Sequence, residues 1–197
     1  FENPESANLF KHGEFAGAGD FTMRLKGRLE AKTGYETVWL GMHANDNDYV
    51  ALTLRVQTTG CGPTLYLDIV NERMVASQEK PVRTSFTKNL FDKSIVRSVC
   101  SKSEMGRGLG DRILAELENQ GFELTLKREG FRYSGSLALN VPAAGDEPGG
   151  PATIETDSVS RIEPFGAPAF QLGQLRGAKS GETVAYFDRF ELIPNAQ

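Results

Sequence analysis

The sequence is poor in the residues that catalysis and metal binding use most often. Its 197 residues include two cysteines, two histidines and one tryptophan. Two cysteines allow at most one intramolecular disulfide, Cys61–Cys100, and the sequence leaves open whether it forms. Neither cysteine lies in a Cys-x-x-Cys motif or has a clear histidine partner. Thiol chemistry and cysteine-based metal binding are therefore disfavoured.

Two further absences narrow the range of partners. The chain has no apolar run of roughly 18–20 residues, so we expect no membrane-spanning segment. It also has no excess of positive charge, because 22 Lys and Arg stand against 26 Asp and Glu, a net charge of −4. We expect no nucleic-acid partner, since contacts with phosphates need a concentrated basic surface. The chain begins at Phe1 without a signal-like apolar segment, which fits either a processed protein or a domain of a longer one.

Glycine is abundant, with 21 residues, and there are 9 prolines, whereas only 39% of the residues are hydrophobic. This composition favours many short elements joined by tight turns, as in β-sandwiches and barrels. The length suits one undivided domain, so we expect residues 1–197 to form a single domain.

Alternation of apolar and polar residues predicts strands along most of the chain. In residues 21–30, Phe21, Met23, Leu25 and Leu29 alternate with polar residues, so one face of the strand is buried and the other solvated. The same reasoning predicts strands at 36–43, 49–56, 64–70, 122–137 (a hairpin), 169–175 and 184–193. Together they predict one antiparallel all-β domain.

The middle of the chain is less regular. Residues 73–103 show no steady period, and a short helix is expected at 111–118, where Ile113, Leu114 and Leu117 share one side. A strand followed by a loop fits those residues equally well. The glycine-rich stretch 106–110 lacks the Gly-x-Gly-x-x-Gly spacing of nucleotide-binding loops and is expected to be a flexible loop. Residues 142–152, rich in Gly and Pro, are expected to form a surface loop.

Four stretches, in chain order, resemble concanavalin A-like lectin/glucanase (LamG-like) domains. They are Gly19–Leu25 (GDFTMRL), Trp39–Leu52 (WLGMH to DYVAL), Phe122–Gly130 (FELTLKREG) and Ala185–Leu192 (AYFDRFEL). The resemblance implies an all-β jelly roll, a two-sheet antiparallel β-sandwich with loop and short-helix insertions. Those insertions are expected around residues 57–120 and 138–168, which have no counterpart in the resemblance.

The resemblance alone does not select a function, because the superfamily includes sugar-binding modules, adhesion domains, glucanases and lyases. Since no complete catalytic set is present, we expect a non-catalytic carbohydrate-binding or adhesion module that recognises a polysaccharide or other glycan. A secreted or cell-surface setting follows from that expectation. A structural module of a larger assembly is an alternative, and the glycan and the oligomeric state stay open.

A glycan-cleaving enzyme is the main alternative, with His43, Tyr49 or Asp68 at its centre. Retaining glucanases of this superfamily carry Glu-x-Asp-x-(x)-Glu on one strand face, and the nearest match is Tyr66 to Glu72. It has Tyr in place of the first Glu, and the spacing from Asp68 to Glu72 is one residue too long. The lyases use Tyr and His, but their strand motifs are absent, so no catalytic residue is predicted.

Sugars dock on aromatic faces while charged and amide groups bind their hydroxyls. If Trp39 points to the concave face of the sandwich, His43 and several arginines can line the same groove. The basic side of the strand at 21–30 would suit an anionic glycan. The candidate ligand-binding residues are Trp39, His43, Tyr49, Arg24, Arg28 and Arg55.

Sandwiches of this superfamily often hold one structural Ca²⁺, which prefers six to eight oxygen ligands. Asp20 and Asp188 belong to the opening and closing motifs, on strands expected to be neighbours, and Glu14 could join them from the preceding loop. The turn cluster Asn45–Asp48 is a second candidate for the same ion.

Overall fold

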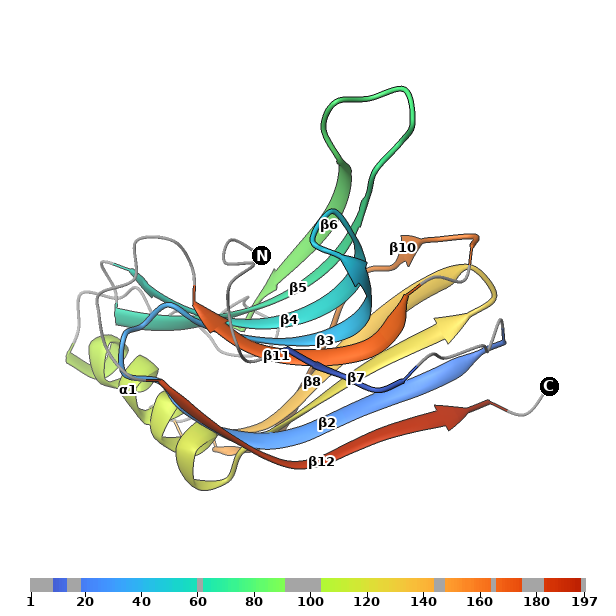
Figure 1. Ribbon diagram of the computed structural model, residues 1–197. Coiled ribbons are helices and arrows are strands. Elements are labelled where there is room, and N and C mark those ends of the chain that lie inside the picture. Colours follow the sequence, from blue (N-terminus) through green and yellow to red (C-terminus); the bar gives the residue numbers. More distant parts are fainter. Residues whose placement is uncertain are drawn as a thin grey trace.

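The structure of the protein, a computed structural model, describes residues 9–13, 19–59, 62–90, 104–143, 148–163, 166–174 and 183–195. In these residues two antiparallel sheets lie face to face, and one helix covers an end of the stack (Figure 1). The prediction of an all-β, two-sheet antiparallel sandwich is thus confirmed. Cys61 and Cys100 lie outside the described residues, so their disulfide stays a prediction.

The first sheet, called the front sheet below, has six strands, each antiparallel to its neighbours. Their order is β1 (Leu9–Lys11), β11 (Ala167–Gln174), β3 (Glu36–Asn45), β4 (Asp48–Thr59), β5 (Gly62–Arg73) and β6 (Val82–Asn89). Strands β3 to β6 follow one another as hairpins, and β11 returns from late in the sequence to pair with β3. The predicted turn at Asn45–Asp48 joins β3 to β4.

The second sheet, called the back sheet, contains the remaining strands. Their order is β10 (Val159–Ser160), β8 (Arg132–Val141), β7 (Phe122–Glu129), β2 (Phe21–Glu30) and β12 (Val184–Pro194), with β9 (Gly150–Glu155) also paired to β8. In the described part of the chain β12 is the outermost strand on its side. Its register against β2 is interrupted by a bulge between Phe187 and Arg189.

Alternate residues of both sheets point inward and form one apolar core. On β2, Phe21, Met23, Leu25 and Leu29 are buried, whereas the charged residues between them are exposed. Burying each such side chain stabilises the fold by roughly 1.5–3 kcal/mol, so the two-residue period fixes which side of the strand faces inward. Their counterparts on the front sheet are Val38, Leu40, Met42, Val50, Leu52, Leu54, Leu65, Leu67 and Ile69.

Helix α1 (Glu104–Asn119) closes one end of the sandwich, which confirms a helix in this segment and extends it at both ends. Leu109, Ile113 and Leu117, spaced four residues apart, join the core, and this burial outweighs the low helix propensity of the glycines at 106–110. The prediction of a loop at 106–110 was therefore wrong. A Cβ at Gly110 would lie 2.3 Å from the Pro63 carbonyl oxygen, so glycine permits the close approach of helix and strand. This helix is too short to cross a bilayer, and the described residues contain no longer one.

The two segments without a counterpart in the resemblance contribute to the sandwich itself. Residues 57–120 include all of β5 together with β6 and α1, and residues 138–168 include β9 and β10. Strand β6 escaped prediction because it is the outer strand of the front sheet and is mostly exposed, so no apolar alternation marks it. In the expected loop at 142–152, β9 begins at Gly150.

Candidate functional site

The outer face of the front sheet collects aromatic and charged side chains. Side chains alternate along a strand, and Val38, Leu40 and Met42 of β3 point into the core. Trp39 and His43 of the same strand therefore point to the outer side of the sheet. The register places Tyr49 and Arg55 of β4 on that same outer side. In Figure 1 the strands of this sheet bow toward the back sheet, so the outer face is concave. We call it the front face.

Trp39, Tyr49 and His43 form an aromatic cluster on the front face. The Trp39 ring meets the His43 and Tyr49 rings edge-on, with centroid separations of 5.7 and 6.3 Å. All three side chains are buried. Ala51 lies in the same buried cluster, and Leu9 of β1 packs against it. Three of the six predicted ligand residues therefore contact one another.

His43 lies at the end of β3, next to the turn. Its Nε2 is 3.5 Å from Asp46 Oδ1, whereas its buried Nδ1 has no hydrogen-bond partner among the described residues. Burial lowers the pKa of His43, and the positive charge of Lys11 lowers it further against the opposing effect of Asp46. The imidazole is therefore held neutral near physiological pH.

His43 begins a polar row that crosses four strands. The register pairs His43 with Tyr49, Tyr49 with Glu72, and Glu72 with Arg83. The Tyr49 hydroxyl donates a hydrogen bond of 2.9 Å to Glu72 Oε2, and Arg83 NH1 lies 3.8 Å from that oxygen. Burial and the Glu72 carboxylate both raise the pKa of the Tyr49 phenol, so it stays protonated and acts as a donor.

A second polar cluster on the front face centres on Arg55 and Asp68. Arg55 binds Asp68 with two hydrogen bonds, from Nε to Oδ2 (2.8 Å) and from NH2 to Oδ1 (3.2 Å), and donates a third from NH1 to Gln57 (2.6 Å). The Thr87 hydroxyl also donates to Asp68 Oδ1 (2.6 Å), and the Arg55 guanidinium stacks on the Tyr66 ring at 4.3 Å. These contacts hold the pair in one geometry. The Asp68 side chain keeps 14% of its surface exposed, so solvent reaches it.

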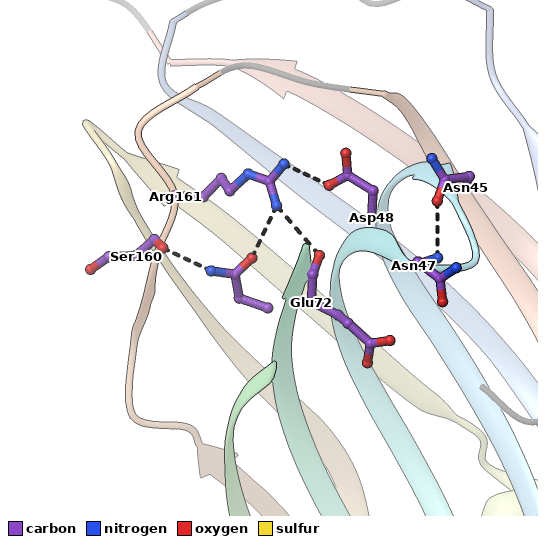
Figure 2. Close-up of polar contacts among 7 residues, drawn as sticks. Asn45, Asn47, Asp48, Glu72, Ser160 and Arg161 are labelled. Atoms are coloured by element: carbon purple, nitrogen blue, oxygen red, sulfur yellow. Dashed lines mark hydrogen bonds and ion pairs between the residues drawn. The ribbon is translucent and has the colours of Figure 1, made fainter. Parts of the chain in front are cut away.

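Arg161 supports the polar row from inside the sandwich (Figure 2). It follows β10 of the back sheet and is only 5% exposed. Its NH2 binds Asp48 Oδ1 at 2.6 Å, and its NH1 reaches Asn71 Oδ1 and the Glu72 carbonyl, each at 3.4 Å. Asn71 in turn donates to the Ser160 carbonyl at 2.9 Å. Arg161 thus joins the back sheet to two neighbours of Tyr49, namely Asp48, which precedes it, and Glu72, its cross-strand partner.

Comparisons with known proteins can be set against this geometry. No protein-family model and no curated protein matches the sequence. Among solved structures, a legume lectin-like domain from Entamoeba histolytica matches with a TM-score of 0.53 and 11% identity, covering 95% of this chain and 78% of that one. The CBM2 module of the evolved Dit of Lactobacillus casei BL23 phage J-1 matches with a TM-score of 0.45 and 8% identity, covering 95% of this chain and 67% of that one.

The first of these likenesses concerns the fold. The chain shares its two-sheet β-sandwich with a legume lectin-like domain. It agrees with the two-sheet antiparallel sandwich that the sequence resemblance implied, although the two chains share only 11% of their residues.

Two of the predicted ligand residues do not belong to the front face of the sandwich. Arg24 and Arg28 point outward from β2 in the back sheet, so the whole core separates them from Trp39, His43 and Arg55. Grouping all six in one groove was therefore wrong. Alternation shows which residues share one face of a strand, but it does not show which sheet the strand joins.

The expected calcium ligands do not form one site either. Asp20 precedes Phe21, which pairs with Pro194, while Asp188 lies in the bulge opposite Lys26 and Gly27. Six strand positions separate the two carboxylates, roughly 20 Å. Asp20 instead accepts a hydrogen bond of 2.6 Å from Gly130 N, and Asp188 faces Arg28 at 3.9 Å. Glu14 lies outside the described residues.

The turn at Asn45–Asp48 does not fit calcium better. Figure 2 shows Asn45 Oδ1 accepting a hydrogen bond of 2.9 Å from Asn47 N, and Asp48 bound to Arg161. Asp46 lies against His43. The turn oxygens thus already have protein partners, and within the described ranges no three His, Cys, Asp or Glu side chains converge to hold a metal.

Proposed function

We propose that the protein is a non-catalytic carbohydrate-binding or adhesion module that binds its glycan on the front face. The observation that carries this proposal is the Arg55–Asp68 pair, fixed against Tyr66 and partly open to solvent on a concave sheet. A fixed carboxylate and guanidinium can bind sugar hydroxyls, and an adjacent aromatic ring can pack on the C–H groups of the sugar. An extracellular setting belongs to the proposal, because that is where such glycans are displayed.

The fold supports the same proposal. One solved structure of similar fold is a legume lectin-like domain. Since one fold hosts several functions, the likeness supports sugar binding only together with the chemistry of the front face.

The second candidate is a glycan-cleaving enzyme, favoured by one observation: His43 and Tyr49 are direct cross-strand partners. Their placement disagrees with that role, however, because Tyr49 is only 2% and His43 only 8% exposed, and the Tyr49 hydroxyl is already bonded to Glu72. A hydrolase centred on Asp68 and Glu72 fits no better. The two lie four residues apart on one extended strand, roughly 13 Å, beyond the separation of about 5–9.5 Å used by glycosidases.

The proposal is tested by measuring affinity for a panel of polysaccharides with front-face and back-face variants. Tyr66→Ala and Thr87→Ala remove contacts of the Arg55–Asp68 cluster, and each should weaken binding about tenfold if the ligand docks there. Arg24→Ala and Lys26→Ala change exposed residues of the back sheet and serve as matched controls.

Loss of binding in the front-face variants alone would support the proposal, provided that their circular dichroism matches that of the wild type. Loss in the back-face variants alone would place the ligand on the other sheet. Absence of binding to every polysaccharide would overturn the proposal. Release of cleavage products, abolished by His43→Gln, would establish the enzyme instead.

A further inference from the structure

The charges of the front face point to the class of glycan that it accepts. We infer that its ligand is a neutral, hydroxyl-rich saccharide rather than an acidic one; this inference rests on the proposed function. In the described residues of the face and its adjoining turn, Lys11, Arg55 and Arg83 are matched by Asp46, Asp68 and Glu72, and Asp48 of the turn is paired with Arg161. The described part of the face therefore carries no net formal charge to attract a polyanion.

Arg55, a cation of the face, is already bound to protein partners. Arg55 has five N–H donors, and three of them bind Asp68 and Gln57. One side of its guanidinium plane lies against the Tyr66 ring. An acidic sugar would have to approach within a few ångströms of Asp68, and like charges at that distance repel.

Hydrogen-bond acceptors, by contrast, remain available. A carboxylate has about four lone-pair sites, and the contacts of Asp68 with Arg55 and Thr87 use three of them. Glu72 binds the Tyr49 hydroxyl through Oε2, which leaves Oε1 without a hydrogen bond in the described structure. Sugar hydroxyls can donate to such oxygens, whereas the carboxylates of an acidic glycan cannot. The unused groups therefore match a neutral polyol.

Arg83 is a residue through which the face could bind an acidic glycan instead. It is 54% exposed and lies 3.8 Å from Glu72, a loose ion pair at the edge of the sheet. An acidic glycan would be expected to bind through Arg83 or through Lys11, the exposed cations of the described face.

The test compares neutral polysaccharides (glucan, mannan, galactan and xylan) with the carboxymethylated derivative of each, by isothermal titration calorimetry on the whole protein. For a neutral ligand, we expect affinity to change less than about twofold between about 50 and about 500 mM NaCl, because no charges are screened. Each carboxymethylated polymer should bind more weakly than its parent.

Asp68→Asn supplies a readout that a structural defect would not give. It removes one negative charge and leaves Arg55 only partly paired, so binding of the neutral polymer should fall while binding of the carboxymethylated polymer rises and becomes salt-dependent. Lys26→Gln, on the exposed side of β2, removes a charge from the back face and should change neither measurement.

The possible failures are distinguishable. Tighter binding of the carboxymethylated polymers that weakens with salt and with Arg83→Gln would overturn the inference, although the protein would still bind glycans on the front face. No binding to any polymer of either charge would overturn the proposed function and this inference with it. If Asp68→Asn does not fold, the salt dependence of binding by the wild type and by Arg83→Gln still shows whether the ligand is neutral or acidic.

Discussion

Replacing Arg161 with alanine should be among the most damaging single changes outside the apolar core. The variant removes a side chain that joins the back sheet to Asp48, Asn71 and the Glu72 carbonyl at this end of the sandwich. It also leaves Asn71 Oδ1 facing a cavity where the guanidinium was.

The cost can be worked out from these contacts. Breaking a buried ion pair by removing one partner typically costs about 3–5 kcal/mol. Asp48 is 27% exposed, so water can solvate it after the change, and the two contacts at 3.4 Å are long. We therefore expect the lower end, about 3 kcal/mol, which in a domain of this size lowers Tm by about 6–12 °C.

Urea denaturation followed by circular dichroism measures this difference, and Arg132→Ala is the matched control. Arg132 is an exposed arginine of β8, near the same end of the sandwich, and its loss should change the free energy of unfolding by no more than about 0.5 kcal/mol. A double-mutant cycle with Asp48→Ala should give a coupling energy of about 2 kcal/mol.

A loss below about 1 kcal/mol for Arg161→Ala, or a coupling energy near zero, would refute the reasoning. The first result would mean that the sheets hold together without this contact. The second would mean that the 2.6 Å ion pair contributes no net stability.

Four further substitutions test other features. Because burial lowers the pKa of His43 below its ordinary value of 6.5, the unfolded chain takes up a proton more readily, so the free energy of unfolding should fall as pH drops below about 6.5 and fall less in His43→Gln. In α1, Gly108→Ala should stabilise by about 0.5–1 kcal/mol because its Cβ meets open space, whereas Gly110→Ala should destabilise by about 1–3 kcal/mol through its clash with Pro63. Trp39→Ala should cost about 3–5 kcal/mol by opening a cavity in the aromatic cluster.

Each of these has a clear contrary result. Identical stability profiles of wild type and His43→Gln between about pH 7 and about pH 5 would mean that His43 does not contribute to acid sensitivity. Equal effects of the two glycine substitutions, measured in urea, would contradict the close packing of α1 on β5. A loss of under about 1 kcal/mol for Trp39→Ala would show that the cluster is loosely packed.

Much of the sandwich could be predicted from local patterns because most of its strands have one buried side and one solvent-exposed side. Residues 21–30 coincide with β2, and the alternation in 122–137 marks the β7–β8 hairpin. Strand β6 gave no such signal because both of its faces are largely exposed. Its place in the sheet depends on pairing with β5, a contact that no local pattern encodes.

The candidate site could be predicted only where its residues lie on strands that are neighbours in sequence. Trp39, His43 and Tyr49 could be grouped because they lie on adjacent strands of one hairpin, which sequence order places side by side. Arg24 and Arg28 could not be assigned correctly, since the choice of sheet for β2 depends on pairing with β7 and β12, far away in the sequence. Arg161 was missed because it reaches Asp48 across 113 positions of the chain, and only tertiary structure brings the two together.

The bulge in β12 has a consequence for how copies of the protein meet one another. An outermost strand of eleven residues offers a row of backbone groups on which a neighbouring molecule could add its own strand and so begin a fibre. Here the bulge between Phe187 and Arg189 breaks that row, Arg189 and Glu191 place charges beside it, and Pro194 ends it with a residue that lacks an N–H. Crowded molecules are thereby hindered from joining edge to edge into an amyloid-like stack.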